Sequence, residues 1–146
     1  MKKTILIILI AALTFGGTTL ISCKKKTKDP DYPQLIGAWK GTTSQNIPIE
    51  IDVANTAGDL YVTMVVLKFS AAPGDTSSFT SYNSGGLSML SGKSFTVVLD
   101  GAAPYQTNVQ GIFRTDTLRL SGNFTGYSAS YPTTPVTGTY SALKSK

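Results

Sequence analysis

The side chain best suited to covalent chemistry in this sequence is Cys23, the only cysteine of the 146-residue chain. It lies in the stretch LISCKKK, where an apolar run ends and a block of lysines begins. One cysteine cannot form an intramolecular disulfide or a cysteine-rich metal site. A nucleophilic thiol is usually activated by a histidine, and the chain has none. We therefore do not expect Cys23 to be catalytic, and the lysines that follow it also argue against a buried structural thiol.

A second group able to do acid–base chemistry is the pair Glu50 and Asp52 in the stretch IPIEIDVA. In a strand, residues two apart point to the same side, so these carboxylates could form a general-acid pair. The alternating apolar residues of Ile47–Val53 favour a simpler interpretation, the wet face of a half-buried strand. No histidine, metal-ligand cluster or phosphate-binding loop accompanies the pair. We predict a protein that is not an enzyme and has no catalytic residue, metal or cofactor.

The amino terminus has the composition of a secretory signal. Lys2 and Lys3 precede an apolar run from Ile5 to Leu13, and small and hydroxylated residues follow. This order of charged, apolar and small residues is typical of a secretory signal peptide. The apolar run is shorter than the about 20 residues that a transmembrane helix needs. Cleavage just before Cys23 would make that cysteine the first residue of the mature protein.

The residues Leu20–Cys23, LISC, resemble the lipobox of bacterial lipoproteins, in which branched residues and a small residue precede a cysteine. The resemblance implies that the Cys23 thiol carries a fatty acyl chain such as palmitate, and that the new amino terminus is usually acylated as well. Two or more acyl chains hold a protein stably on a membrane, whereas one does so marginally. We therefore expect a lipoprotein signal peptide over residues 1–22 and a membrane anchor at Cys23.

Residues 23–34 are predicted to be the lipidated cysteine and a flexible basic tether. The stretch KKKTKDPDYP is charged and almost free of apolar residues, so burial cannot compensate for ordering it. Residues 24–34 would reach at most about 36 Å, and their lysines should be attracted by anionic headgroups. The resemblance to lipoproteins implies the outer membrane, because Lys24 is not the retention signal of inner-membrane lipoproteins. Bacteroidota-type lipoproteins on the cell surface often carry an acidic run here, and its absence favours the periplasmic side.

The basic character of the chain belongs to its first 34 residues. The chain has 13 Lys and Arg against 8 Asp and Glu. Residues 1–34 hold six of the basic and two of the acidic residues, which leaves seven against six for residues 35–146. These remaining residues fit one small domain. Because this domain is nearly neutral, nucleic-acid binding is not expected.

Residues 35–146 read as β-structure throughout. Short runs rich in Val, Ile, Thr and aromatic residues alternate with Gly, Pro, Asn, Asp and Ser, which is typical of strands and turns. Short connections predict an antiparallel meander, and Ser70–Gly86 is expected to be mainly a long flexible loop. Strands are predicted at Leu35–Thr43, Ile47–Ala54, Leu60–Phe69, Leu87–Leu90, Ser94–Leu99, Thr107–Phe113, Thr117–Ser121 and Pro135–Leu143, with Ser78–Tyr82 and Phe124–Tyr131 as further candidates.

About eight strands without covering helices must bury one face against each other. Closure into a small antiparallel up-and-down barrel does this and removes exposed edges. A two-sheet β-sandwich is the alternative. The barrel predicts that Leu35–Thr43 pairs with Pro135–Leu143.

The stretch LIGAWKGT resembles the opening strand of lipocalin-like (calycin) barrels, which begin with Gly-x-Trp, matched here by Gly37 and Trp39. The resemblance implies that Trp39 packs across the closed end of the barrel, and VTGTYSALK resembles the strand that returns to pair with the first. The match departs from the family in two respects. Lipocalins place an arginine over the tryptophan, where this chain offers only Lys144, and no helix follows the last strand. An avidin-like closure is therefore a further option.

Two functions follow from an anchored barrel. The first is binding of a small apolar ligand in the barrel interior, with Ser70–Gly86 as a lid. The second is a structural or protein-interaction lipoprotein whose barrel is filled by its own side chains. In the first case alternation places one set of side chains inside, and Tyr140 would offer its hydroxyl to a polar ligand group. The predicted lining is Val62, Met64, Val66, Phe95, Val97, Leu99, Leu118, Leu120 and Tyr140.

Overall fold

The computed structural model describes residues 32–100 and 104–146. A short 3-10 helix, η1 (Pro33–Leu35), precedes nine strands. In chain order they are β1 (Gly37–Thr43), β2 (Pro48–Thr56), β3 (Asp59–Phe69), β4 (Ser77–Tyr82), β5 (Ser88–Met89), β6 (Ser94–Asp100), β7 (Thr107–Arg114), β8 (Arg119–Ser128) and β9 (Tyr131–Lys144).

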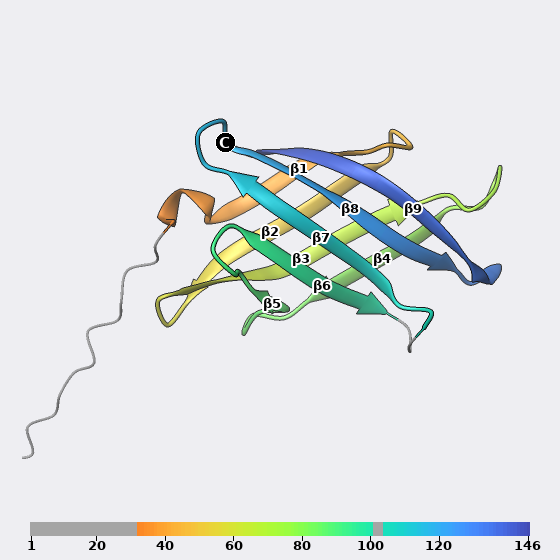
Figure 1. Ribbon diagram of the computed structural model, residues 1–146, viewed down its shortest axis with the longest axis horizontal. Coiled ribbons are helices and arrows are strands. Elements are labelled where there is room, and N and C mark those ends of the chain that lie inside the picture. Colours follow the sequence, from red (N-terminus) through yellow and green to blue (C-terminus); the bar gives the residue numbers. More distant parts are fainter. Residues whose placement is uncertain (1–31, 101–103) are drawn as a thin grey trace, which may run out of the picture.

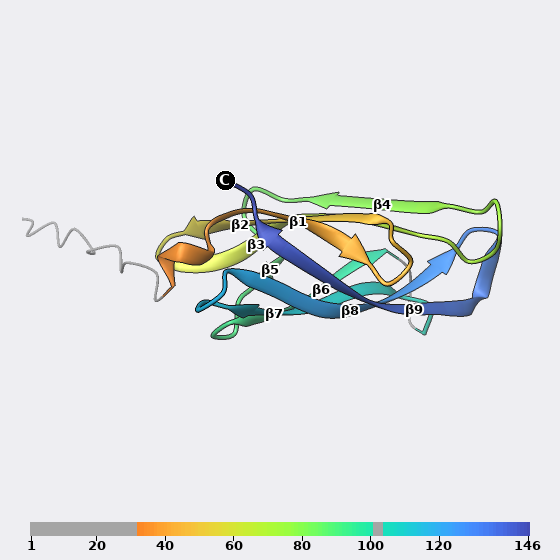
Figure 2. The same ribbon diagram turned by 90° about the horizontal axis from the view of Figure 1, so that it is seen from above.

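All nine strands belong to one antiparallel sheet. Its order is β4-β3-β2-β1-β9-β8-β7-β6, and the two-residue β5 also pairs with β3. The first and last long strands are joined, with Trp39 opposite Lys144 and Thr43 opposite Tyr140. The sheet therefore curls into a nearly closed, flattened barrel, in which the half β1–β4 lies over the half β6–β9 (Figures 1 and 2). The predicted all-β barrel and its pairing of first and last strands are confirmed.

Most predicted strands agree with the structure, and the differences lie at their ends. The strand predicted at Thr117–Ser121 begins at Arg119 and runs on to Ser128, and β9 begins earlier than predicted. The candidate at Ser78–Tyr82 is β4, which pairs with β3. It divides the expected long loop Ser70–Gly86 into two shorter segments.

Aromatic rings from both halves of the barrel fill its interior. The Trp39 ring meets Phe113 edge-on, with ring centroids 4.9 Å apart, and Phe113 packs against Phe95 at 5.6 Å. Further along the barrel axis, Phe69 stacks with Phe124 at 5.8 Å. Trp39 and Phe69 come from the half β1–β4 and are completely buried. These contacts join the two halves into one hydrophobic core.

Strand β3 changes face part-way along its length. Its register with β2 shifts between Asp52 and Val53, so that Thr63 is an extra residue in β3. Such a β-bulge interrupts the strict alternation of a strand. Val62 points inward before the bulge and Val65 points inward after it, and both are completely buried.

The prediction that Met64 and Val66 point inward together with Val62 is wrong, because the bulge lies between Val62 and Met64. Met64 lies opposite Asp52 and Val66 opposite Glu50, and residues directly opposite in a sheet share a face. Both side chains are therefore on the outer, carboxylate-bearing face, where they are half-buried. The alternation on which the prediction rested holds only for a strand without an extra residue.

Candidate functional site

The barrel interior contains most of the predicted lining, but as packed core. Val62, Phe95, Val97, Leu120 and Tyr140 are buried together there, and Leu99 packs against them from a partly buried position. An eight-stranded barrel is just wide enough for its own side chains to fill it, and these residues do so together with the aromatic rings described above.

Leu118 lies outside this interior. It was predicted to share a face with Leu120, but it belongs to the turn between β7 and β8 and is 40% exposed. Its backbone φ is 46°, in the left-handed region that a branched residue rarely adopts. Because β8 starts only after this residue, strand alternation does not apply to Leu118, and the prediction is wrong.

The end of the barrel at which the chain enters is closed by η1. The indole Nε1 of Trp39 donates a 2.9 Å hydrogen bond to the Leu35 carbonyl oxygen. Lys144, directly opposite Trp39 in the sheet, donates from Nζ to the Gln34 carbonyl oxygen at 2.7 Å. Gly37 has φ 122° and lies against the Lys144 side chain. The last strand thus supplies a lysine beside the tryptophan, at the end where the resemblance to lipocalins implies an arginine.

Tyr140 uses its hydroxyl within the barrel. The hydroxyl donates a 2.9 Å hydrogen bond to the Gln110 carbonyl oxygen, and the side chain is 4% exposed. Burial raises the pKa of the Tyr140 phenol well above its ordinary value. The ring crosses Gly122 and reaches Gly111, where a β-carbon at either position would collide with the ring's hydroxyl or with backbone. The predicted donor to a ligand is therefore already bonded to the protein.

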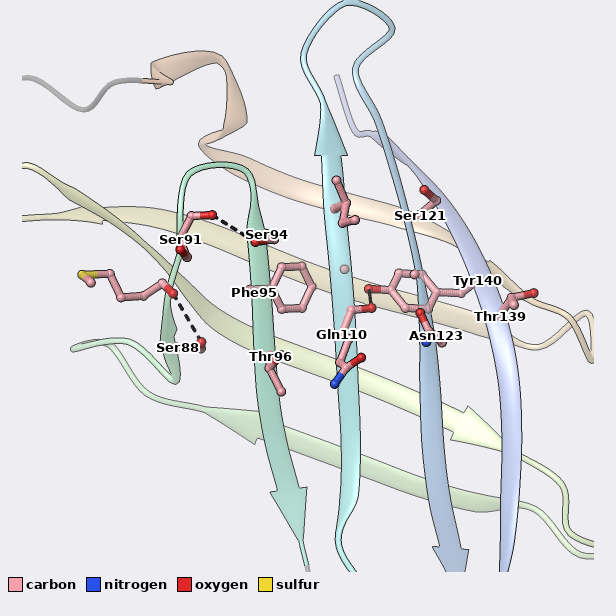
Figure 3. A pocket seen from close by; sticks show the side chains of 14 residues that line it. Ser88, Ser91, Ser94, Phe95, Thr96, Gln110, Ser121, Asn123, Thr139 and Tyr140 are labelled. Carbon is pink, nitrogen blue, oxygen red and sulfur yellow. Dashed lines mark hydrogen bonds between the residues drawn. The ribbon is translucent and has the colours of Figure 1, made fainter.

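An open groove crosses the outer face of β6–β9 (Figure 3). Its volume is about 790 Å³. In the close-up, the rings of Phe95 and Tyr140 point toward each other between β6 and β9 (Figure 3). The groove is lined by Ser88, Met89, Ser91, Ser94, Phe95, Thr96, Gln110, Gly111, Ile112, Ser121, Gly122, Asn123, Thr139 and Tyr140, none of which is charged.

Sequence reasoning missed this groove. Its exposed side chains, such as Thr96, Gln110 and Asn123, occupy the outward positions of their strands, which are polar in any half-exposed sheet. The signal that could have revealed it is the run of uncharged outward residues in the middle of four neighbouring strands, between Asp100 at one end and Arg114 and Arg119 at the other. That signal has meaning only when the strand order is known.

A smaller hollow of about 200 Å³ lies on the outer face of β1–β3, beside the carboxylate pair. Lys40 forms a 2.9 Å ion pair with Glu50, and the hydrogen bond and charge of Glu50 raise the pKa of Lys40. Burial, and then the charge of Glu50, raise the pKa of Asp52, whose Oδ1 is buried without a hydrogen-bond partner. Both carboxylates are half-buried on the outer face. Within the described residues, no group of three or more His, Cys, Asp or Glu side chains could hold a metal.

No family model matches this chain, and no curated protein or solved structure matches it. The resemblances to lipoproteins and to lipocalin-like barrels therefore rest on the sequence motifs. Cys23, the signal peptide 1–22 and most of the tether 23–34 lie outside the described residues. No helix within residues 32–100 and 104–146 is long and apolar enough to cross a membrane.

Proposed function

We propose that this protein is a lipoprotein of the bacterial cell envelope whose barrel acts through its outer surface as a protein-interaction module. Residues 1–22 are the signal peptide that is removed on export, and acylated Cys23 is the membrane anchor. The order of charged, apolar and small residues before LISC supports both assignments. The proposed location is the outer membrane on its periplasmic side, with the cell surface as the alternative.

The filled barrel interior is the observation that carries the choice of an interaction module. The completely buried side chains include four large aromatic ones, Trp39, Phe69, Phe113 and Phe124, which meet across the two halves of the barrel. A ligand of the size of a fatty acid would have to displace these rings, and protein interiors are packed too densely to yield such a volume cheaply. The packing therefore favours the second sequence-based function over a ligand held in the barrel.

The outer groove is the proposed contact surface. It offers hydroxyl and amide groups with two exposed apolar side chains, Met89 and Ile112, and no charge. A partner segment that is itself polar and uncharged would bury these groups without leaving an ion unpaired. The protein is proposed to be non-enzymatic, because its sequence has no histidine to act as a general base near neutral pH.

Site-specific photo-crosslinking in the producing cell tests this proposal. A photoreactive residue at Asn123, which lines the groove, is expected to yield a discrete protein adduct. The matched control is the same residue at Thr80, which is exposed on β4 in the other half of the barrel. Equal adducts at both positions, or none at Asn123, would contradict the groove as contact surface.

Native mass spectrometry of the barrel purified from the same cells tests the choice between the two functions. The expected mass is that of the protein alone, because the interior is occupied by side chains. A stoichiometric small molecule that is released on unfolding would restore the ligand-binding alternative.

A further inference from the structure

The two ends of the barrel differ in charge. The chain enters through η1 at the end where β9 finishes and where β7 turns into β8 (Figure 1); we call this the proximal end. It carries five basic residues against the acidic Asp59 and Asp116, whereas the opposite, distal end carries Lys68 against Asp75 and Asp100. The proximal basic residues are Lys93, Arg114, Arg119, Lys144 and Lys146.

Two of these basic residues stand in an arrangement that costs the barrel stability. Arg114 and Arg119 are directly opposite each other on β7 and β8, and both are exposed. Like charges directly opposite in a sheet are destabilising. Neither guanidinium forms an ion pair within the described part of the chain. An external anion would turn this unfavourable pair into a binding element.

Exposed apolar side chains surround the arginine pair. Leu143 lies opposite Arg119 and is 54% exposed. Leu118, in the turn between the two arginines, is also exposed and has a left-handed backbone conformation. We call the set Arg114, Leu118, Arg119 and Leu143 the proximal patch. Cations mixed with leucine are the composition of a surface that lies at a lipid headgroup boundary.

We propose that the proximal patch docks the barrel on an anionic membrane surface. The tether from Cys23 to Tyr32 would reach at most about 30 Å, so an anchored barrel presents its proximal end to the bilayer. This short link gives the docking step a high effective concentration, and a weak intrinsic affinity is then sufficient. The role of the lipid anchor in this docking rests on the proposed function. The affinity of the proximal patch for anionic lipid does not depend on it.

Vesicle co-sedimentation of residues 32–146 tests the patch without the anchor. Every core side chain lies within this range, so the fragment holds the complete barrel; circular dichroism verifies its fold. It is expected to sediment with vesicles of phosphatidylcholine containing phosphatidylglycerol, and not with phosphatidylcholine alone. Each cation near such a surface contributes about fivefold in affinity, and about 0.5 M salt should abolish the binding.

Charge reversal at matched positions distinguishes the patch from overall charge. Arg119→Glu changes two units of charge and should weaken vesicle binding about 25-fold. Lys68→Glu makes the same change at the distal end of β3, which β2, β1 and β9 separate from β8 in the sheet, and should change binding less than twofold because salt screens charges over about 10 Å. Arg119→Glu also places opposite charges across β7 and β8, so its unfolding midpoint should rise by about 2–5 °C. A loss of binding in this variant therefore cannot be attributed to unfolding.

Three outcomes would overturn the proposal. They are the absence of sedimentation with phosphatidylglycerol vesicles at low salt, an equal loss of binding in the two charge-reversal variants, and salt-sensitive binding to a soluble polyanion without binding to vesicles. If acyl labelling of Cys23 failed while vesicle binding held, the anchor would be wrong and the patch would stand.

Discussion

Replacing Tyr140 with phenylalanine removes a single oxygen atom from the barrel interior. In the wild-type protein that oxygen donates a hydrogen bond to the Gln110 carbonyl from a ring that is 4% exposed. Near neutral pH the variant loses this bond, and its free energy of unfolding should be lower by about 1 kcal/mol. The remaining ring keeps its packing, so no cavity adds to this cost.

The sign of this difference should reverse at high pH. Burial raises the pKa of the Tyr140 phenol in the folded state, whereas in the unfolded chain a tyrosine ionises with a pKa of about 10. The stabilising contribution is therefore complete below pH 10 and is lost as the pH rises above it, because only the unfolded state can release the proton. At pH 11 this linkage lowers wild-type stability by about 1.4 kcal/mol. The phenylalanine variant has no such proton, so it should become the more stable protein by about 0.4 kcal/mol.

Urea unfolding of residues 32–146 between pH 7 and pH 11 measures both effects. Trp39, the only tryptophan, is completely buried and reports unfolding by its fluorescence. Subtracting the two proteins at each pH cancels the contributions of all other titrating groups. A difference that stays constant from pH 7 to pH 11 would refute the reasoning, because it would show that the Tyr140 hydroxyl ionises as readily folded as unfolded.

Three further experiments, two of them with a matched control substitution, test the barrel and the proposed anchor. Val65→Trp should overpack the interior and cost about 1–3 kcal/mol, while Met64→Trp on the outer face should cost less than about 0.5 kcal/mol; equal costs in urea unfolding would place the bulge elsewhere. Gly122→Ala would push a methyl group into a backbone carbonyl of β7 and should cost at least about 3 kcal/mol. Gly85→Ala, whose β-carbon would meet only a side-chain oxygen at 3.3 Å, is its control, and a stable Gly122→Ala barrel would contradict the close strand packing. Cys23→Ser should abolish incorporation of a clickable fatty acid in growing cells; label on that variant would disprove the anchor.

The barrel could be predicted because the alternation of apolar and polar residues that indicates its strands extends over many residues. Alternation in Ile47–Val53 and Ser94–Leu99 identified inward faces correctly, and Ile49, Ile51, Phe95 and Val97 are buried. The pairing of the first strand with the last followed from the need to remove exposed edges. Both inferences depend on which side chains are buried, and the order of apolar and polar residues along a strand indicates this directly.

The local exceptions could not be predicted. β3 is apolar on both faces, so its sequence carries no alternation in which the extra residue Thr63 would be visible. Leu118 is apolar and lies two residues before the buried Leu120, and nothing in TDTLRL marks where the turn ends and β8 begins. The groove across β6–β9 depends on which strands are neighbours, a property of the folded sheet and not of any one segment.

The ladder between β1 and β9 has a consequence for how the protein is made. It joins Trp39 to Lys144, nearly the full length of the domain, and contacts between such distant residues form slowly. In the export proposed above the chain crosses the inner membrane amino terminus first, so this ladder cannot be completed until the last strand has crossed. Until then β1 and β8 present unpaired edges, which are templates for aggregation. The arrival of β9 pairs the free edges of β1 and β8, and β4 and β6 remain as the outer strands of the sheet.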